Sequence, residues 1–290
     1  MSKQPPIART VDELRSTVAK WRKSGETVAL VPTMGSIHAG HLSLIATAKQ
    51  HACRIVTSVF VNPTQFGPKE DFKRYPRDEK GDVEKLAAAG TDLVYAPSVE
   101  EMYPKGSSTS VKVLNLSDDL CGGARPQHFE GVATIVTKLL MQAEPDVAVF
   151  GEKDYQQLIV IRSLVRDLFM PVEIIGSPIV REEDGLAISS RNVYLSPSER
   201  KTAPVLHQVL SKIASDLSEG RGCDDASGSG RFKLEAAGFR VNYVAVRDAS
   251  TLDPLSAGPV RGPARVLAAA YLGATRLIDN VAVPPASTNR

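Results

Sequence analysis

The chain has 290 residues, which suits one large domain or two of ordinary size, and its 42% hydrophobic and 23% charged residues exclude wholesale disorder. A formal net charge of +2 gives no reason to expect a nucleic-acid partner, and no apolar stretch approaches the ~18 residues of a membrane span. The cysteines Cys53, Cys121 and Cys223 show neither a C-x-x-C pair nor a zinc spacing. The N-terminus is polar and lacks the apolar centre of a secretory signal, so we expect a cytoplasmic protein without disulfides or membrane contact.

Apolar runs alternate with amphipathic helical patterns in the first part of the chain. The β-branched run at 54–61 is typical of a central parallel strand that is buried on both faces. Strands are predicted at 28–31, 54–61, 92–96, 111–114, 146–150 and 172–175, and helices at 12–23, 41–48, 78–89, 131–141 and 155–168. This alternation predicts an α/β fold, with a doubly wound, Rossmann-like parallel sheet of about five strands over residues 1–179.

The pattern changes over residues 180–290, where we expect a smaller α+β domain. Ser196 is a candidate N-cap, Pro197 suits the first helical position, and Glu199 completes a capping box. Helices are predicted at 196–218 and 231–237, a Gly- and Ser-rich loop at 220–230, antiparallel strands at 239–246, 265–271 and 275–280, and a frayed tail at 284–290.

The most informative segment is V-P-T-M-G-S-I-H-A-G-H at residues 31–41, where a strand leads through a turn to a helix start. Helix N-termini bind phosphate, because their first N–H groups lack intrahelical partners and the helix dipole favours negative charge. His38 and His41 are three residues apart and can face one side of the first turn, while glycine at 35 and 40 permits close approach. A surface patch or a simple helix cap is the alternative, but the strand before and the helix after this segment favour a polyphosphate site.

Three further polar segments lie near predicted strand ends, where ligands bind in open α/β sheets. Asn62 and Gln65 offer neutral donors and acceptors for a small substrate, although a turn built on Asn-Pro explains them equally well. Lys153 lies at a helix N-terminus, which is unfavourable for its charge unless an anion binds there. Asp154 can cap that helix or bind a ribose hydroxyl, and Gln157 can face the same cleft, the alternative being a chance surface pair of Lys153 and Asp154.

The third segment, Ser189-Ser190-Arg191, lies just past the predicted domain boundary and offers two hydroxyls and a guanidinium as a phosphate clamp. Serine-rich linkers are common, so this tripeptide alone favours an ordinary linker.

These motifs together carry a family resemblance. T-M-G-x-x-H-x-G-H resembles the H-x-G-H signature of the nucleotidyltransferase and class I aminoacyl-tRNA synthetase superfamily. N-P-x-Q-F, R-P-x-H-F-x-G-V, G-E-K-D-x-Q-Q and S-S-R-N follow in the order and approximate spacing of pantoate–β-alanine ligases, so residues 31–192 resemble that family. The K-M-S-K-S signature of the synthetases is absent. Ser189-Ser190-Arg191 occupies its place, as in the ligases, and Lys153 would supply the ammonium group.

The resemblance implies ATP-dependent condensation of D-pantoate with β-alanine through a pantoyl adenylate, giving pantothenate, AMP and diphosphate. By this resemblance the catalytic residues are His38, His41, Lys153, Ser189, Ser190 and Arg191, the ATP-binding residues are Met34, Gly40, Gly151, Asp154, Val180 and Ile188, and the pantoate-binding residues are Asn62, Gln65 and Gln157. Residues 1–179 would bind nucleotide and pantoate, and residues 180–290 would close over the ATP. Mg²⁺ is expected as the counterion of ATP, with no all-protein metal site.

A homodimer is also expected from the resemblance. The sequence suggests a route, since the run at 111–116, which contains the predicted strand 111–114, carries one charge, on Lys112, and is poorly protected for a sheet edge. The alternatives to a ligase are a nucleotidyltransferase of the same superfamily and a non-catalytic nucleotide-binding regulatory protein. An aminoacyl-tRNA synthetase is disfavoured, because the chain lacks a basic anticodon-binding extension.

Overall fold

The structure is a computed structural model that describes residues 4–68, 70–255 and 258–285. The chain divides into two compact units, the larger comprising residues 1–152 and 160–178 and the smaller comprising 153–159 and 179–290. Among the described residues, no helix has the length and apolar character needed to cross a membrane. The predicted division into domains at 179–180 stays a prediction, and residues 286–290 of the predicted tail lie outside the described residues.

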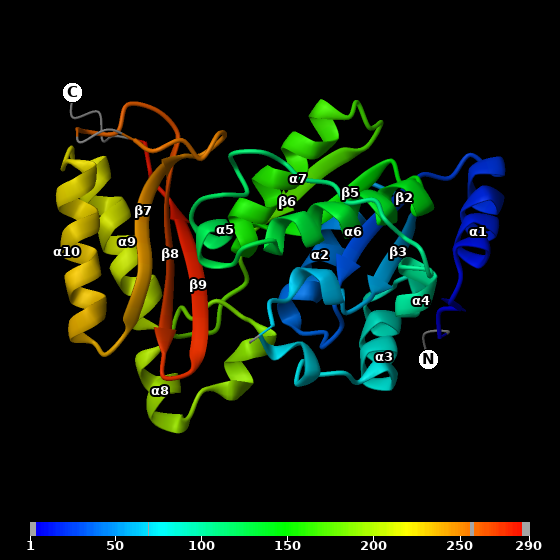
Figure 1. The fold of residues 1–290 in the computed structure, drawn as a ribbon, viewed down its shortest axis with the longest axis horizontal. Coiled ribbons are helices and arrows are strands. Elements are labelled where there is room, and N and C mark those ends of the chain that lie inside the picture. The colour runs from blue at the N-terminus through cyan, green and yellow to red at the C-terminus, as the bar shows by residue number, and fades with distance from the viewer. Residues whose placement is uncertain (1–3, 69, 256–257, 286–290) are drawn as a thin grey trace. The chain divides into compact units, whose positions relative to one another are not determined.

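The larger unit contains a six-stranded parallel sheet in the order β1-β4-β3-β2-β5-β6, so the predicted Rossmann-like fold is confirmed (Figure 1). Its strands are β1 (Ile7–Ala8), β2 (Val28–Thr33), β3 (Arg54–Val59), β4 (Leu93–Tyr95), β5 (Val147–Gly151) and β6 (Glu173–Ser177). The chain passes from β2 to β3 on one side and returns to β5 on the other. The carboxyl ends of β2 and β5 are therefore the switch point where such sheets bind ligands.

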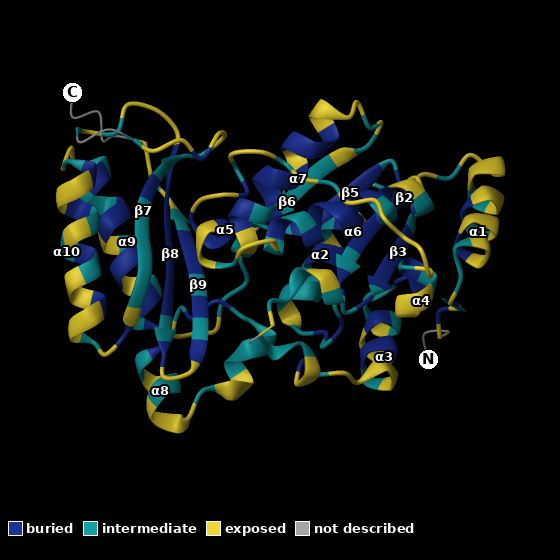
Figure 2. Ribbon diagram, viewed as in Figure 1, coloured by how far each residue is buried: buried dark blue, intermediate teal, exposed yellow. Residues whose placement is uncertain are grey.

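Helices flank this sheet, and its central strands are almost entirely buried, as Figure 2 shows in dark blue. The elements are α1 (Val11–Lys23), α2 (Ala39–Ala48), α3 (Glu79–Ala89), α4 (Val99–Met102), α5 (Cys121–Ala124), α6 (His128–Ala143) and α7 (Tyr155–Asp167), with single 3₁₀ turns η1 (Pro63–Gln65), η2 (Asp71–Lys73) and η3 (Glu152–Asp154). Thr10 caps α1 through a capping box with Glu13. Continuous apolar strands fit a parallel sheet covered on both faces.

One predicted strand of this unit is wrong. Residues 111–114 form no strand, and the chain turns at 114–118, where Asn115 has a φ of 64°. The Val111 N–H donates to the Thr134 hydroxyl (2.9 Å), so a side chain replaces the expected strand partner. The described edge strands are β1 and β6 instead, which removes the predicted edge-strand route to a dimer. β1 was not predicted, because a strand of two residues is too short to show a periodic pattern.

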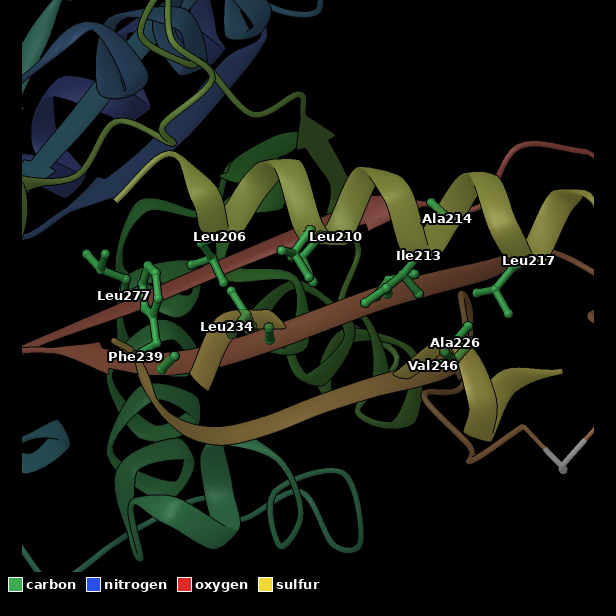
Figure 3. Close-up of a cluster of buried hydrophobic side chains, with 14 of the residues drawn as sticks. Leu206, Leu210, Ile213, Ala214, Leu217, Ala226, Leu234, Phe239, Val246 and Leu277 are labelled. Atoms are coloured by element: carbon green, nitrogen blue, oxygen red, sulfur yellow. The ribbon is translucent and has the colours of Figure 1, made fainter. Parts of the chain in front are cut away.

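The smaller unit is an antiparallel three-stranded sheet with helices, which confirms the predicted α+β character. Its elements are β7 (Arg240–Asp248), β8 (Ala264–Leu272), β9 (Thr275–Ala282), α8 (Pro197–Thr202), α9 (Val205–Ser218), α10 (Cys223–Ala236) and the 3₁₀ helix η4 (Ser190–Tyr194). In Figure 3, Leu206, Leu210, Ile213 and Leu217 of α9 point into a common apolar cluster with Leu234 of α10. Their spacing is that of one helix face, so burial of this face against the sheet forms the core of the unit.

Two predictions for the smaller unit need correction. The capping box at Ser196 and Glu199 is present, but the helix ends at Thr202 and a second helix starts at Val205, because Pro204 has no N–H to continue the first. The predicted loop at 220–230 is wrong, since α10 already begins at Cys223. Its buried residues are Cys223, Ala226, Gly230 and Leu234, which share one face. Packing of this face outweighs the low helix propensity of the glycines and serines.

Two glycines of α10 test this correction. Among the described residues nothing lies within 4 Å of a Cβ added at Gly228, whereas one added at Gly230 would overlap the Ile213 side chain. Gly228→Ala should raise the free energy of unfolding by up to ~1 kcal/mol through helix propensity. Gly230→Ala should be less stable than Gly228→Ala by about 1–3 kcal/mol, because the core becomes overpacked. Urea unfolding measures both, and equal stabilities would contradict this packing.

Candidate functional site

The turn between β2 and α2 has an unusual backbone. Gly35 and Ser36 follow one another in the left-handed region, with φ values of 78° and 53°. A Cβ added at Gly35 would lie 2.9 Å from a carboxylate oxygen of Asp82, so the turn requires glycine there. The α2 helix begins at Ala39 with His38 as its N-cap, two residues earlier than the sequence predicted.

The buried carboxylate of Asp82 holds this turn. Asp82 belongs to α3 and is 1% exposed, and its two oxygens accept the N–H groups of Ser36 (2.8 Å) and Ile37 (2.7 Å). The Lys85 ammonium, one turn along α3, donates to the Ile37 carbonyl (2.9 Å). Our sequence reasoning missed Asp82. The available signal was its position four residues before Leu86, on the apolar face of α3.

The two histidines stack at the start of α2. Their ring centroids are 4.0 Å apart and the rings are inclined by 19°, so the prediction that both face one side of the first turn is confirmed. A Cβ at Gly40 would lie 3.0 Å from Cε1 of His38, so glycine makes room for the ring. The first turn of α2 contains no acidic residue. Its dipole and N–H groups therefore suit an anion.

Gln65 joins the turn to the segment after β3. Its side-chain amide donates to the Met34 sulfur (3.1 Å), and its side-chain carbonyl accepts from Asn62 (3.1 Å). Asn62 is 1% exposed, and it also donates to the Gly131 carbonyl (3.1 Å) and accepts from the Tyr103 hydroxyl (2.8 Å). Met34 and Gln65 thus lie together as expected, while the Asn62 side chain is engaged with protein groups that fix Gln65.

The R-P-x-H-F motif, for which the sequence predicted no role, fixes the main chain at Gln65. His128 donates to the Gln65 carbonyl (2.8 Å), and Arg125 donates to the other ring nitrogen of His128 (2.9 Å). Arg125 also forms two 2.6 Å hydrogen bonds with the Glu70 carboxylate. Burial favours a higher pKa for Glu70, but these bonds and the guanidinium charge hold the pKa below its ordinary value. Glu70 is therefore ionised at neutral pH.

The other predicted residues lie in the smaller unit, apart from Gly151, which ends β5. Lys153 and Asp154 lie in η3 with their charged groups 3.6 Å apart, and the Lys153 side chain is 21% exposed. Gln157 lies in the first turn of α7. Lys153 follows the end of β5 by two residues, so its predicted position near a strand end is confirmed.

Val180 and Ile188, two of the residues expected to bind ATP, share one hairpin. The Ile188 N–H donates to the Val180 carbonyl (3.0 Å), and a β-bridge joins Arg181 to Ala187. The hairpin leads directly into η4, where the Ser189 hydroxyl caps the helix by accepting from the Arg191 N–H (3.3 Å). The structure thus brings Val180 and Ile188 together and places Ser189, Ser190 and Arg191 immediately beyond them.

Comparison with known proteins agrees with these motifs. A family model described as pantoate–β-alanine ligase matches residues 6–282. The chain belongs to the pantoate–β-alanine ligase family. A ligase relative named pantothenate synthetase, from Rhodospirillum rubrum, is 56% identical over 279 residues, which cover 96% of this chain and 99% of that protein. A second, from Caulobacter vibrioides, is 54% identical over 96% of this chain and 99% of that protein.

Solved pantoate–β-alanine ligases share the fold. The pantothenate synthetase of Thermus thermophilus has a TM-score of 0.91 and 48% identity, covering 97% of this chain and all of that one. The ligase of Francisella tularensis, solved in complex with beta-gamma ATP and beta-alanine, has a TM-score of 0.79 and 32% identity, covering 96% of this chain and 97% of that one.

Replacing Asp82 with asparagine tests the turn. The amide keeps one acceptor but directs an NH₂ group at the other backbone N–H, so Asp82→Asn should lower the free energy of unfolding by about 1–3 kcal/mol. Glu84→Gln is the matched control, because Glu84 is exposed on the same helix. It should change stability by less than ~0.5 kcal/mol. Denaturant unfolding that finds the two variants equally stable would refute the role of Asp82.

Proposed function

We propose that this protein catalyses the ATP-dependent condensation of pantoate with β-alanine, giving pantothenate, AMP and diphosphate. The observation that carries the proposal is the stacked pair of His38 and His41 at the start of α2, in a chain of the pantoate–β-alanine ligase family. The Francisella tularensis ligase, solved with beta-gamma ATP and beta-alanine, supports these substrates.

The chemistry requires activation of a carboxylate. In the first step a pantoate carboxylate oxygen attacks the α-phosphorus of ATP, and the bond to the departing diphosphate breaks. In the second step the amine of β-alanine attacks the acyl carbon, the bond to AMP breaks, and the nitrogen loses a proton. Phosphoryl chemistry of this kind needs in-line positioning and stabilisation of charge rather than covalent help from the protein.

Six residues are assigned to stabilising the negative charge on the phosphates. His38 and His41 act from the larger unit, and Lys153, Ser189, Ser190 and Arg191 act from the smaller unit. Imidazole, ammonium, hydroxyl and guanidinium groups all donate hydrogen bonds to phosphate oxygens.

The remaining residues serve recognition. Gln65 and Gln157 bind the hydroxyl and carboxylate groups of pantoate, and Asn62 acts with them by fixing Gln65. The residues assigned to ATP are Met34 and Gly40 at the phosphates, Gly151 and Asp154 at the ribose, and Val180 and Ile188 at the adenine. Neutral amides suit pantoate, because they pair with hydroxyl and carboxylate groups alike.

Mg²⁺ accompanies ATP in this proposal, bound through phosphate oxygens and water, as magnesium usually is. In the described ranges, no three His, Cys, Asp or Glu side chains gather as a metal site. The proposal also includes a homodimer, as the family resemblance implied, and a cytoplasmic location. The three free cysteines are compatible with a reducing compartment.

An assay of AMP release tests the function. The protein should release AMP in step with pantothenate only when ATP, pantoate and β-alanine are all present. His38→Ala and His41→Ala should each lower the single-turnover rate of adenylate formation by at least ~10²-fold, or ~3 kcal/mol of transition-state stabilisation. A stable nucleotide adduct would instead indicate a nucleotidyltransferase, and ATP binding without AMP release would indicate a regulatory protein. Either outcome would overturn the proposal.

A further inference from the structure

Strand β9 of the smaller unit holds the main chain of Lys153. Asn280 lies on β9 and is 2% exposed, and its side-chain amide donates to the Lys153 carbonyl (3.0 Å). Lys153 is part of η3, a single 3₁₀ turn between β5 and α7. Such turns have weak internal hydrogen bonds. An external donor to the Lys153 carbonyl therefore strongly constrains the position of the Lys153 backbone, from which the side chain extends.

The neighbouring residue, Asp279, holds the hairpin of Val180 and Ile188. Its carboxylate is 3% exposed and accepts two hydrogen bonds from Arg181, at 2.7 and 2.9 Å. Arg181 also donates to the Asn280 carbonyl (3.3 Å). Burial favours a higher pKa for Asp279, but His207 and Arg181 hold the pKa below its ordinary value. Asp279 is therefore ionised at neutral pH, and its ion pair with Arg181 fixes the hairpin to β9.

The same network reaches η4. Asn192, which follows Arg191, donates from its side chain to the Ala187 carbonyl in the hairpin (3.0 Å). Two consecutive residues of one strand thus fix Lys153 directly and the hairpin through Arg181, and the hairpin in turn fixes the start of η4. All of these contacts lie within the smaller unit.

We infer that Asn280 is a positioning residue for the adenylation step, acting through the main chain of Lys153. The inference rests on the proposed function, in which the Lys153 ammonium meets charge that develops on the phosphates. Because displacement of a charged group by about 1 Å can cost ~10²-fold in rate, loss of the Asn280 donor should act on the transition state. Asn280 itself touches no reacting atom in this proposal.

Asn280→Leu removes the amide donor and keeps a side chain of similar size. It should lower the single-turnover rate of pantoyl-adenylate formation by at least ~10-fold, while the KM for pantoate changes by less than ~3-fold. Asn242→Leu is the matched control, because Asn242 on β7 accepts from Arg276 (3.1 Å) instead of contacting Lys153. Its adenylation rate should stay within ~2-fold of that of the unchanged protein. If Asn280→Leu does not fold, Asn280→Ala carries the same prediction.

A double-mutant cycle separates positioning from general structure. If Asn280 acts only through Lys153, Asn280→Leu should cause no further loss of adenylation in a Lys153→Ala background. Losses that multiply, or near-normal adenylation by Asn280→Leu alone, would overturn the inference. Normal adenylation by Lys153→Ala would overturn the proposed role of the lysine and this inference with it. Absence of adenylate with the unchanged protein would instead overturn the proposed function itself.

Discussion

The geometry of the β2–α2 turn depends on one buried carboxylate. Gly35 and Ser36 take left-handed backbone angles, which is costly for a residue with a side chain, and Asp82 accepts the N–H groups of Ser36 and Ile37 that such a turn directs inward. His38 follows at once as the N-cap of α2. The position of the stacked imidazoles therefore depends on a residue of α3 that is more than 40 positions away in the sequence.

Each unit orders its own share of the proposed site by the same means, a buried or partly buried polar side chain that binds main-chain atoms. In the larger unit, His128 holds the Gln65 carbonyl and Arg125 holds His128. In the smaller unit, Asn280 holds the Lys153 carbonyl, and Arg181 joins the hairpin to Asp279. Such hydrogen bonds hold the main chain firmly, because breaking one would leave a polar group without a partner in the interior, which costs free energy. The side chains proposed to bind phosphate can then remain partly exposed while their backbone is fixed.

The sequence was sufficient for the elements whose signals are local. The parallel sheet, the capping box at Ser196, and the strand–turn–helix at His38 follow from periodicity and helix-cap chemistry. The sequence was insufficient where tertiary contacts determine whether a segment forms a helix or a strand. The segment at 111–114 has alternating residues but no strand partner, and α10 forms despite its glycines because one face is buried. Asp82 and Asn280 were missed for a related reason. Each binds a segment that is distant in the sequence, and the residues around it do not indicate which segment that is.

The central claim, that pantoate is activated through its carboxylate as an acyl adenylate, predicts the fate of one oxygen atom. Pantoate labelled with ¹⁸O in both carboxylate oxygens should be converted together with β-alanine and ATP, and the AMP analysed by mass spectrometry. Attack on the α-phosphorus followed by amide formation leaves one ¹⁸O in AMP and the other in the amide carbonyl of pantothenate. Unlabelled AMP, or label recovered in diphosphate or phosphate, would contradict this mechanism.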